Sequence, residues 1–236
     1  MRRPPLADTV AALRDLPVNY AEAEAPPVVT AGWHVDRCVL DLGREEPGEP
    51  EPGGLLETAG ALVNHYEFSD PSILRAAFRY PGDLVGRDML LEGRFLVLRF
   101  LLGVRITAQH DEVRTGPHGP ERVIGWSYQT LRGHLEQGRL TYELAKELET
   151  GRVEFRILAY SRRAPIRNPV LRLGFRLFGR HTQLRFYRQA LARLRTLLQA
   201  PPSPPQPGPD GLVRAPSGVE ARRFEAFTLR LAHPGA

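Results

Sequence analysis

The sequence predicts an α+β protein in which an antiparallel sheet packs against one long C-terminal helix. Residues 123–131 and 140–162 alternate apolar and polar side chains with the two-residue period of β-strands. The Thr150-Gly151 pair divides the second run where a two-residue hairpin turn would lie. Residues 168–198 instead carry apolar side chains every three or four positions, which is the period of a helix.

The composition is that of a globular domain. The chain has 236 residues, of which 42% are hydrophobic and 25% charged, which is enough for a sizeable core. Cys38 is the single cysteine, so no disulfide within the chain can support the fold in an oxidising compartment. The start of the chain lacks the apolar core of a secretory signal, and the apolar run at 95–102 is far shorter than the roughly 20 residues that cross a bilayer. We therefore expect a cytoplasmic protein.

The positive charge does not by itself indicate a nucleic-acid partner. The net charge is +5 and the pI about 9.8, but Lys146 is the only lysine among 32 basic residues. Such an arginine excess more often reflects genome composition than phosphate binding, and no nucleic-acid-binding motif accompanies it. We therefore do not expect nucleic acid as a partner. One face of the predicted last helix carries Arg172, Arg176, Arg180 and Arg188. Such a basic face can contact a membrane surface, but a charged helix face is more often solvated, so peripheral membrane contact is not favoured.

The first third of the chain predicts an arm, a strand and a helix. Asp8 can cap a short helix, after which prolines make residues 1–27 irregular, so this segment is expected to pack as an arm. Residues 33–40 alternate like a first strand. Residues 44–54 are rich in proline, glycine and glutamate and predict a surface loop, and residues 55–66 carry apolar side chains at helical spacing.

The middle of the chain predicts strands. Residues 73–78 fit a short helix or a strand, and the pattern does not separate the two. Residues 89–106 are apolar on both alternating faces, and we interpret them as one long bent strand with Gly93 and Gly103 at the bends. Residues 116–120 turn the chain into the strand at 123–131, where Trp126 and Tyr128 share a face.

A turn at Thr150-Gly151 fixes the pairing of the predicted hairpin. The buried face would pair Leu148 with Val153, Leu144 with Ile157 and Tyr142 with Ala159. The other face would pair Glu149 with Arg152 and Glu147 with Glu154, which suits water.

The last helix begins at Asn168, an N-cap, followed by Pro169 in the first turn. About 30 residues give it a length on the order of 45 Å. A proline-rich segment at 201–209 ends it, and the tail beyond either docks as a strand or stays loose. We therefore predict one domain at 28–199, flanked by the arm at 1–27 and an extension at 200–236.

The order of these elements resembles the helix-grip fold, which is START-like and polyketide-cyclase-like. The chain also resembles an uncharacterised family of bacteria and plants, domain-of-unknown-function family nineteen-ninety, over about residues 16–190. The most specific motif is Tyr128-x-Thr130-Leu131-x-Gly133-His134-x-Glu136-x-Gly138, although Leu135 stands where many relatives have proline. Further matches are Asn19-Tyr20, residues 86–91 and 103–105, Gly151, residues 154–156, Ser161-Arg162, Asn168-Pro169 and residues 174–180 with Gln183. The resemblance implies a curved sheet around the helix, an apolar cavity and no established reaction.

These expectations predict a protein that binds a hydrophobic or amphipathic small molecule, lipid-like or polyketide-like, between the sheet and the last helix. His134 and Lys146 would lie near the mouth of the cavity. The expected lining is Trp126, Tyr128, Tyr142, Phe155, Ile157, His181 and Tyr187.

Each polar candidate also has a structural interpretation. His134, with Glu136 two residues on, suits an acid or base, but a histidine that holds its loop by backbone hydrogen bonds is the favoured interpretation. His181 either faces a ligand or is satisfied by a partner such as a tyrosine hydroxyl. Lys146 either meets an acidic ligand group or extends to the rim.

Two alternative functions stay open. One is an enzyme of cyclase, dehydratase or hydrolase type that uses His134 or His181. The other is an interaction or stress-associated module with a filled core and no ligand. The seven histidines form no close pair, and neither a nucleophile elbow nor a phosphate-binding glycine turn is present. The sequence therefore predicts neither a metal nor a cofactor and leaves catalytic residues and oligomeric state open.

Overall fold

The computed structural model describes residues 5–21, 32–95, 98–166, 168–218 and 229–232. Its helices are α1 (Leu6–Ala11), the 3-10 helix η1 (Ala12–Asp15), α2 (Leu55–Asn64) and α3 (Pro169–Gln199). Its strands are β1 (His34–Arg44), β2 (Leu74–Arg79), β3 (Asp88–Phe95), β4 (Leu98–Gly116), β5 (Gly119–Thr130), β6 (Glu136–Glu147), β7 (Arg152–Arg163), β8 (Leu212–Ala215) and β9 (Leu229–Ala232).

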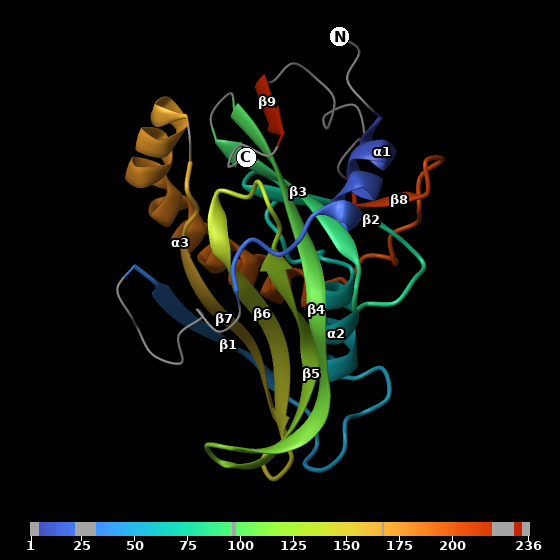
Figure 1. The fold of residues 1–236 in the computed structure, drawn as a ribbon. Helices are drawn as coiled ribbons and strands as arrows, with labels where there is room; N and C mark the ends of the chain where they lie inside the picture. The colour runs from blue at the N-terminus through green and yellow to red at the C-terminus, as the bar shows by residue number, and fades with distance from the viewer. Residues whose placement is uncertain (1–4, 22–31, 96–97, 167, 219–228, 233–236) are drawn as a thin grey trace.

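The strands form one curved sheet in the order β1-β7-β6-β5-β4-β3-β2-β8, with each neighbouring pair antiparallel. β9 pairs in parallel with β4. Helices α2 and α3 lie behind the sheet in Figure 1, and α1 lies in front of it. The predicted α+β fold, a curved antiparallel sheet around a long C-terminal helix, is confirmed.

Glycines allow the strands to approach closely where the sheet bends. A Cβ on Gly125 would lie 2.1 Å from the Tyr142 carbonyl oxygen, and one on Gly138 would lie 2.3 Å from the Tyr160 carbonyl oxygen. Gly125 also has φ +155°, which side-chain-bearing residues rarely adopt. The curvature of β5 to β7 therefore depends on residues without a Cβ.

The sheet is packed on both faces. The inner face, which carries Trp126, Tyr142 and Phe155, packs against buried residues of α2 and α3. The outer face of β2 to β4 packs against Val10 and Leu13 of the N-terminal segment. Burial on both sides explains why residues 89–91 and 100–102 are apolar at odd and even positions alike.

The middle of the chain forms one strand more than predicted. Residues 89–106 are not one long strand, because β3 and β4 form an antiparallel pair in which Phe95 lies opposite Leu98. Periodicity could not reveal this reversal, since both strands are buried on two faces. The pattern of residues 73–78 left a helix and a strand open, and the structure shows the strand, β2, at Leu74–Arg79.

The β6-β7 hairpin keeps its predicted faces but not its predicted turn. Four residues, 148–151, connect the strands, and Gly151 has φ +71°. Tyr142 therefore lies opposite Ile157 and Leu144 opposite Phe155. The predicted register is wrong by two residues, and a shift of two leaves every side chain on its original face.

The prediction that the outer face of this hairpin is exposed to water is wrong. Its charged side chains form a network of ion pairs with residues of β4 and β5. Arg114 lies 3.0 Å from Glu121 and 2.8 Å from Glu143, and Arg156 lies 2.8 Å from Glu121 and 3.1 Å from Glu154. The three glutamates are at most 8% exposed. Arginine side chains, rather than water, cover these carboxylates.

Described segments on both sides of the predicted domain pack against the sheet. Arg105 donates a hydrogen bond to the Leu13 carbonyl oxygen at 2.8 Å, which ties the N-terminal segment to β4. Leu212 and Val213 are fully buried in β8, which pairs with β2. The sheet thus extends beyond the predicted boundary at residue 199. Residues 1–4 and 22–27 of the predicted arm, 28–31 of the predicted domain, 219–228 and 233–236 of the tail, and the Arg176 side chain lie outside the described residues.

Candidate functional site

The inner face of β5 and β6 presents a cluster of aromatic side chains. Trp126 and Tyr128 alternate with Ser127 on β5, so both face inward. Tyr142 lies directly opposite Trp126 on β6, and their ring centroids are 5.0 Å apart. Strand pairing therefore brings together three of the aromatic residues singled out in the sequence.

Tyr66 enters the cluster from the end of α2. It is the non-glycine residue with positive φ in the described chain, at 62°, where helices usually end on glycine. The Glu67 amide reaches back to the Leu62 carbonyl at 3.0 Å and closes the helix end. This termination directs the Tyr66 ring inward, with its centroid 6.2 Å from those of Trp126 and Tyr142.

Four polar atoms of buried aromatic side chains have no hydrogen-bond partner among the described residues. They are Tyr66 Oη, Trp126 Nε1, Tyr142 Oη and Tyr187 Oη, the last on α3. Each of the four residues is at most 1% exposed. Because buried polar atoms in native proteins are almost always paired, these atoms mark a place where another molecule can supply partners.

The tyrosines in this cluster keep their protons. Burial raises the pKa values of Tyr66, Tyr128, Tyr142 and Tyr187 above the usual range for tyrosine. The hydroxyls of Tyr66, Tyr128 and Tyr142 are close enough to shift one another's pKa, yet Tyr66 Oη and Tyr142 Oη lack a partner in hydrogen-bonding geometry. The interior therefore offers neutral O–H and N–H groups as donors.

The unpaired hydroxyl of Tyr142 predicts that its removal does not destabilise the protein. We expect Tyr142→Phe to leave the free energy of unfolding in urea unchanged or to raise it by up to about 1 kcal/mol, because it removes a buried unpaired group. The control is Tyr20→Phe, whose hydroxyl accepts a hydrogen bond from Gln129 at 2.9 Å and whose loss should cost about 1 kcal/mol. A loss of more than 1 kcal/mol in Tyr142→Phe would show that the hydroxyl is paired.

Glu136 lies on the inner face of β6, in alternation with Leu140 and Tyr142. Its carboxylate makes no hydrogen bond within the described residues, whereas its charge raises the pKa of both Tyr128 and Tyr187. Burial raises the pKa of Glu136 to about 7, against the opposing effect of the Arg180 charge. Glu136 is therefore an ionisable group beside the aromatic cluster that changes charge near neutral pH.

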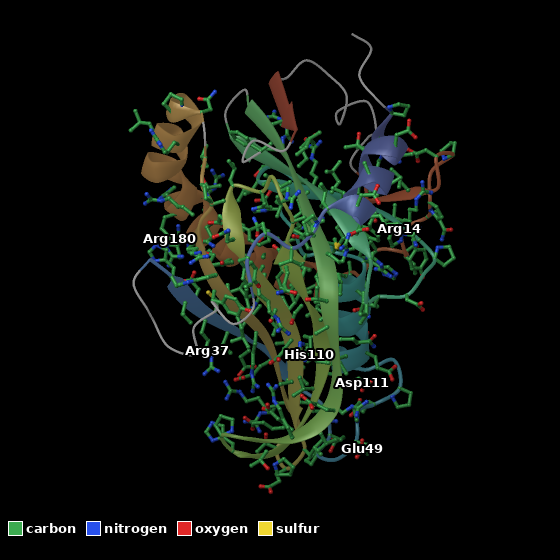
Figure 2. The ribbon with its side chains drawn as sticks, in the orientation of Figure 1. Arg14, Arg37, Glu49, His110, Asp111 and Arg180 are labelled. Atoms are coloured by element: carbon green, nitrogen blue, oxygen red, sulfur yellow. The ribbon has the colours of Figure 1, made fainter. Side chains whose placement is uncertain are left out.

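Arg180 on α3 faces this end of the sheet (Figure 2). Both of its terminal nitrogens donate to the Asp36 carboxylate of β1, and Nη1 also donates to Gln183 at 2.8 Å. A two-pronged pair of this kind neutralises the guanidinium charge. Arg180 is thus engaged within the protein.

The pKa of Glu136 predicts a pH-dependent stability. The native state keeps a proton that the unfolded chain releases, so wild-type stability falls as the pH rises from about 4.5 to about 7. The amide of Glu136→Gln does not ionise, so its stability does not fall over this range. At pH 8 the free energy of unfolding of the variant should therefore have risen relative to that of the wild type by on the order of 2 kcal/mol. Urea unfolding at pH 5, 6, 7 and 8 measures this difference.

His134 provides the internal check on that series. Burial lowers its pKa to about 4, so wild type and variant both lose stability as the pH falls from 6.5 toward 4. This contribution cancels in the difference between the two proteins. A difference that stays constant from pH 5 to 8 would contradict the placement of Glu136.

His134 itself holds its loop. Its Nδ1 accepts a hydrogen bond from the Glu136 amide at 2.9 Å, and its ring is buried and neutral at pH 7. The carboxylate of Glu136 does not orient it, since only the backbone of Glu136 is in contact. These contacts match the structural interpretation of His134.

Lys146 does not reach the aromatic cluster with its charge. It is fully buried, and its Nζ contacts Glu45 Oε2 at 2.8 Å and donates to the Glu49 carbonyl oxygen at 2.9 Å. Figure 2 shows Glu49 at the lower end of the molecule, far from Arg180. The expectation that Lys146 meets an acidic ligand group or extends to the rim is therefore wrong, because Glu45 occupies its charge.

The remaining predicted residues divide between core and surface. Phe155 and Ile157 of β7 are fully buried in the inner core, and Tyr187 is 1% exposed beside Phe186 on α3. His181 is exposed on α3 and does not face the interior as predicted. The apolar spacing of a helix 31 residues long leaves the orientation of any one turn undetermined.

Sequence reasoning missed Tyr66 and the role of Glu136. Alternation along β6 could have placed Glu136 beside Tyr142, because both positions are even-numbered in one strand. Tyr66 belongs to the helical stripe of residues 55–66, but nothing in that stripe shows that the helix ends so as to turn this ring inward.

The described parts of the chain contain neither a grouped set of metal ligands nor a helix that could span a membrane. Within them, no three histidine, cysteine, aspartate or glutamate side chains are grouped so that they could hold a metal ion. The helices among those residues are too short or too polar to cross a bilayer.

Comparison with solved structures finds similar shapes at low identity. The crystal structure of Ara h 8.0201 aligns with a TM-score of 0.39 and 10% identity over 71% of this chain and 99% of that one. A hypothetical protein of Helicobacter pylori gives a TM-score of 0.39 and 10% identity, over 76% and 95% of the two chains. An uncharacterised protein of Rhizobium leguminosarum gives 0.31 and 9%, over 71% and 96%.

Comparison by sequence identifies a family without an assigned activity. No curated protein matches the chain. The family model for a domain of unknown function, DUF1990, matches residues 18–193, about three quarters of the chain. The match includes the aromatic cluster, Glu136 and most of α3. The chain therefore belongs to the DUF1990 family.

Proposed function

We propose that this protein binds a small hydrophobic or amphipathic molecule against the inner face of its sheet, beneath α3. The observation that carries this proposal is the set of four buried polar atoms without partners: Tyr66 Oη, Trp126 Nε1, Tyr142 Oη and Tyr187 Oη. The aromatic rings around them supply an apolar surface, which is the usual composition of a small-molecule site. We place the protein in the cytoplasm, where its lone Cys38 needs no partner.

Tryptophan fluorescence tests the proposal, because the two tryptophans lie on opposite faces. Trp33 packs against Tyr160 and Arg162, away from the cluster, so Trp33→Phe leaves Trp126 as the emitter. Titration with lauric acid, cholesterol and 1-tetralone should give a saturable change in Trp126 emission for at least one of them. Trp126→Phe, which leaves Trp33 as the emitter, should show no such change.

The opposite outcome favours another function. No saturable change with any of the three compounds would contradict the binding proposal and support the interaction module with a filled core. In that case the unpaired atoms would be satisfied by ordered water.

Glu136 favours a second candidate function, an enzyme that transfers a proton to or from the bound molecule. A carboxyl group with a pKa near 7 can act as acid or base at neutral pH. This enzyme would use Glu136, since His134 is engaged by the backbone and His181 is exposed.

The second candidate function is tested by identifying the small molecules that stay bound to the wild type and to Glu136→Gln during purification. An enzyme that lacks its proton-transfer group accumulates substrate, so chromatography with mass spectrometry should extract different molecules, or different isomers of one molecule, from the two purified proteins. The same molecule in both proteins would contradict catalysis by Glu136 and leave binding as the function.

A further inference from the structure

The chemistry of the unpaired atoms restricts what the interior can bind. An indole N–H only donates a hydrogen bond, so the partner of Trp126 Nε1 has to be an acceptor. The Tyr142 ring lies 5.0 Å from the Trp126 ring, and the Tyr66 ring lies 6.2 Å from both. The N–H donor of Trp126 and the O–H donors of Tyr66 and Tyr142 therefore belong to one cluster of neighbouring rings.

The charges around the inner face disfavour an anion. Lys146, at one end of β6, contacts Glu45 Oε2 and the Glu49 carbonyl oxygen. Arg180, near the other end, pairs with Asp36 and Gln183. The ionisable group beside the cluster is Glu136, which is itself an acid. Arg87 lies elsewhere on this face, over the Phe78 and Tyr80 rings at 5.2 and 5.9 Å from their centroids, and its charge acts on the pKa of His65 and not on the pKa values of the cluster tyrosines. A carboxylate bound at Trp126 and Tyr142 would therefore lose its hydration without gaining a cation in exchange.

We infer that the interior takes a neutral ligand with a flat or compact apolar body and a carbonyl-type acceptor oxygen, bound at Trp126 and Tyr142. This inference rests on the proposed function and narrows its substrate class from any amphipathic molecule to neutral ketone-like or quinone-like compounds. A fatty acid, by the same argument, is a poor ligand.

Matched probes test the inference. Two pairs of compounds differ only by one carbonyl group: tetralin and 1-tetralone, and the larger fluorene and 9-fluorenone. A fifth compound, 9-fluorenone-2-carboxylate, adds a negative charge to the larger ketone. Equilibrium dialysis of the full-length protein at pH 8 measures each affinity. We expect at least one ketone to bind about tenfold tighter than its hydrocarbon, since satisfying buried donors is worth on the order of 1.4 kcal/mol. The carboxylate should bind more weakly than 9-fluorenone.

Single hydroxyl deletions locate the acceptor. Tyr142→Phe should reduce the preference for ketone over hydrocarbon several-fold while leaving hydrocarbon affinity unchanged. Tyr160→Phe is the matched control, because its hydroxyl, 3.4 Å from Tyr20 Oη, lies outside the cluster and its loss should not alter the preference. The unchanged hydrocarbon affinity also shows that Tyr142→Phe is folded.

The outcomes separate this inference from the proposed function. Hydrocarbons that bind as tightly as ketones, a preference unaffected by Tyr142→Phe, or a carboxylate that binds most tightly would overturn the inference and leave binding intact. Absence of binding by both hydrocarbons and both ketones would overturn the proposed function and the inference together.

Discussion

Lys146→Ala is expected to lower the free energy of unfolding by about 3–5 kcal/mol, the cost of removing one partner of a buried ion pair. The Lys146 side chain is 0% exposed and that of Glu45 2% exposed, so the substitution leaves a carboxylate in the interior without its cation. Glu45 also accepts a hydrogen bond from the Leu56 amide at 2.7 Å, at the start of α2. The substitution should therefore also destabilise the loop that connects β1 to α2. Urea unfolding at pH 7 measures it.

Two variants show that the effect comes from the buried charge. Arg152→Ala breaks contacts with Asp41 and Glu154, 2.9 and 2.8 Å away. Because Arg152 is partly exposed and Glu154 keeps its pair with Arg156, the substitution should cost at most about 1 kcal/mol. The double variant Glu45→Gln/Lys146→Met removes both charges and should recover much of the stability lost in Lys146→Ala. If Lys146→Ala unfolds within 1 kcal/mol of the wild type, the pair is not buried as described.

Truncation after Gln199 is expected to have an equally large effect. It removes β8, in which Leu212 and Val213 are fully buried, and it uncovers the edge of β2. Burial of each such side chain is worth about 1.5–3 kcal/mol, so the loss of about 3–6 kcal/mol approaches the total stability of many domains. Circular dichroism during thermal unfolding should show a shortened chain that is unfolded or only marginally folded.

The matched control ends the chain at Gly218. This variant keeps β8 and the hydrogen bonds that the Ser217 amide donates to the buried Glu67 carboxylate at 3.1 and 2.8 Å. It loses β9, a four-residue strand that pairs with β4, and should remain folded with a much smaller loss of stability than the chain that ends at residue 199. Equal stability of the chain that ends at residue 199 would instead show that the extension is dispensable.

The faces of the strands and helices could be predicted from the sequence. Alternation reports which side chains share a face, so Trp126, Tyr128 and Tyr142 were placed together without a structure. The same signal does not fix register, because pairing Tyr142 with Ile157 or with Ala159 leaves both on one face.

Other features depend on distant parts of the chain. Glu45 lies about a hundred residues before Lys146, and no local pattern indicates that they pair. The charged network of the outer face likewise joins β4 to β7 through arginines whose partners depend on register. Long-range contacts of this kind required the structure.

The central claim is that the interior of the sheet binds a neutral small molecule. Native mass spectrometry of gently purified protein, followed by denaturing extraction, tests it most directly. We expect a stoichiometric adduct whose released component carries a carbonyl-type oxygen and no permanent charge, and we expect less of it in Tyr142→Phe than in the matched control Tyr160→Phe. A mass equal to that of the polypeptide alone, unchanged after incubation with 1-tetralone and 9-fluorenone, would contradict the claim.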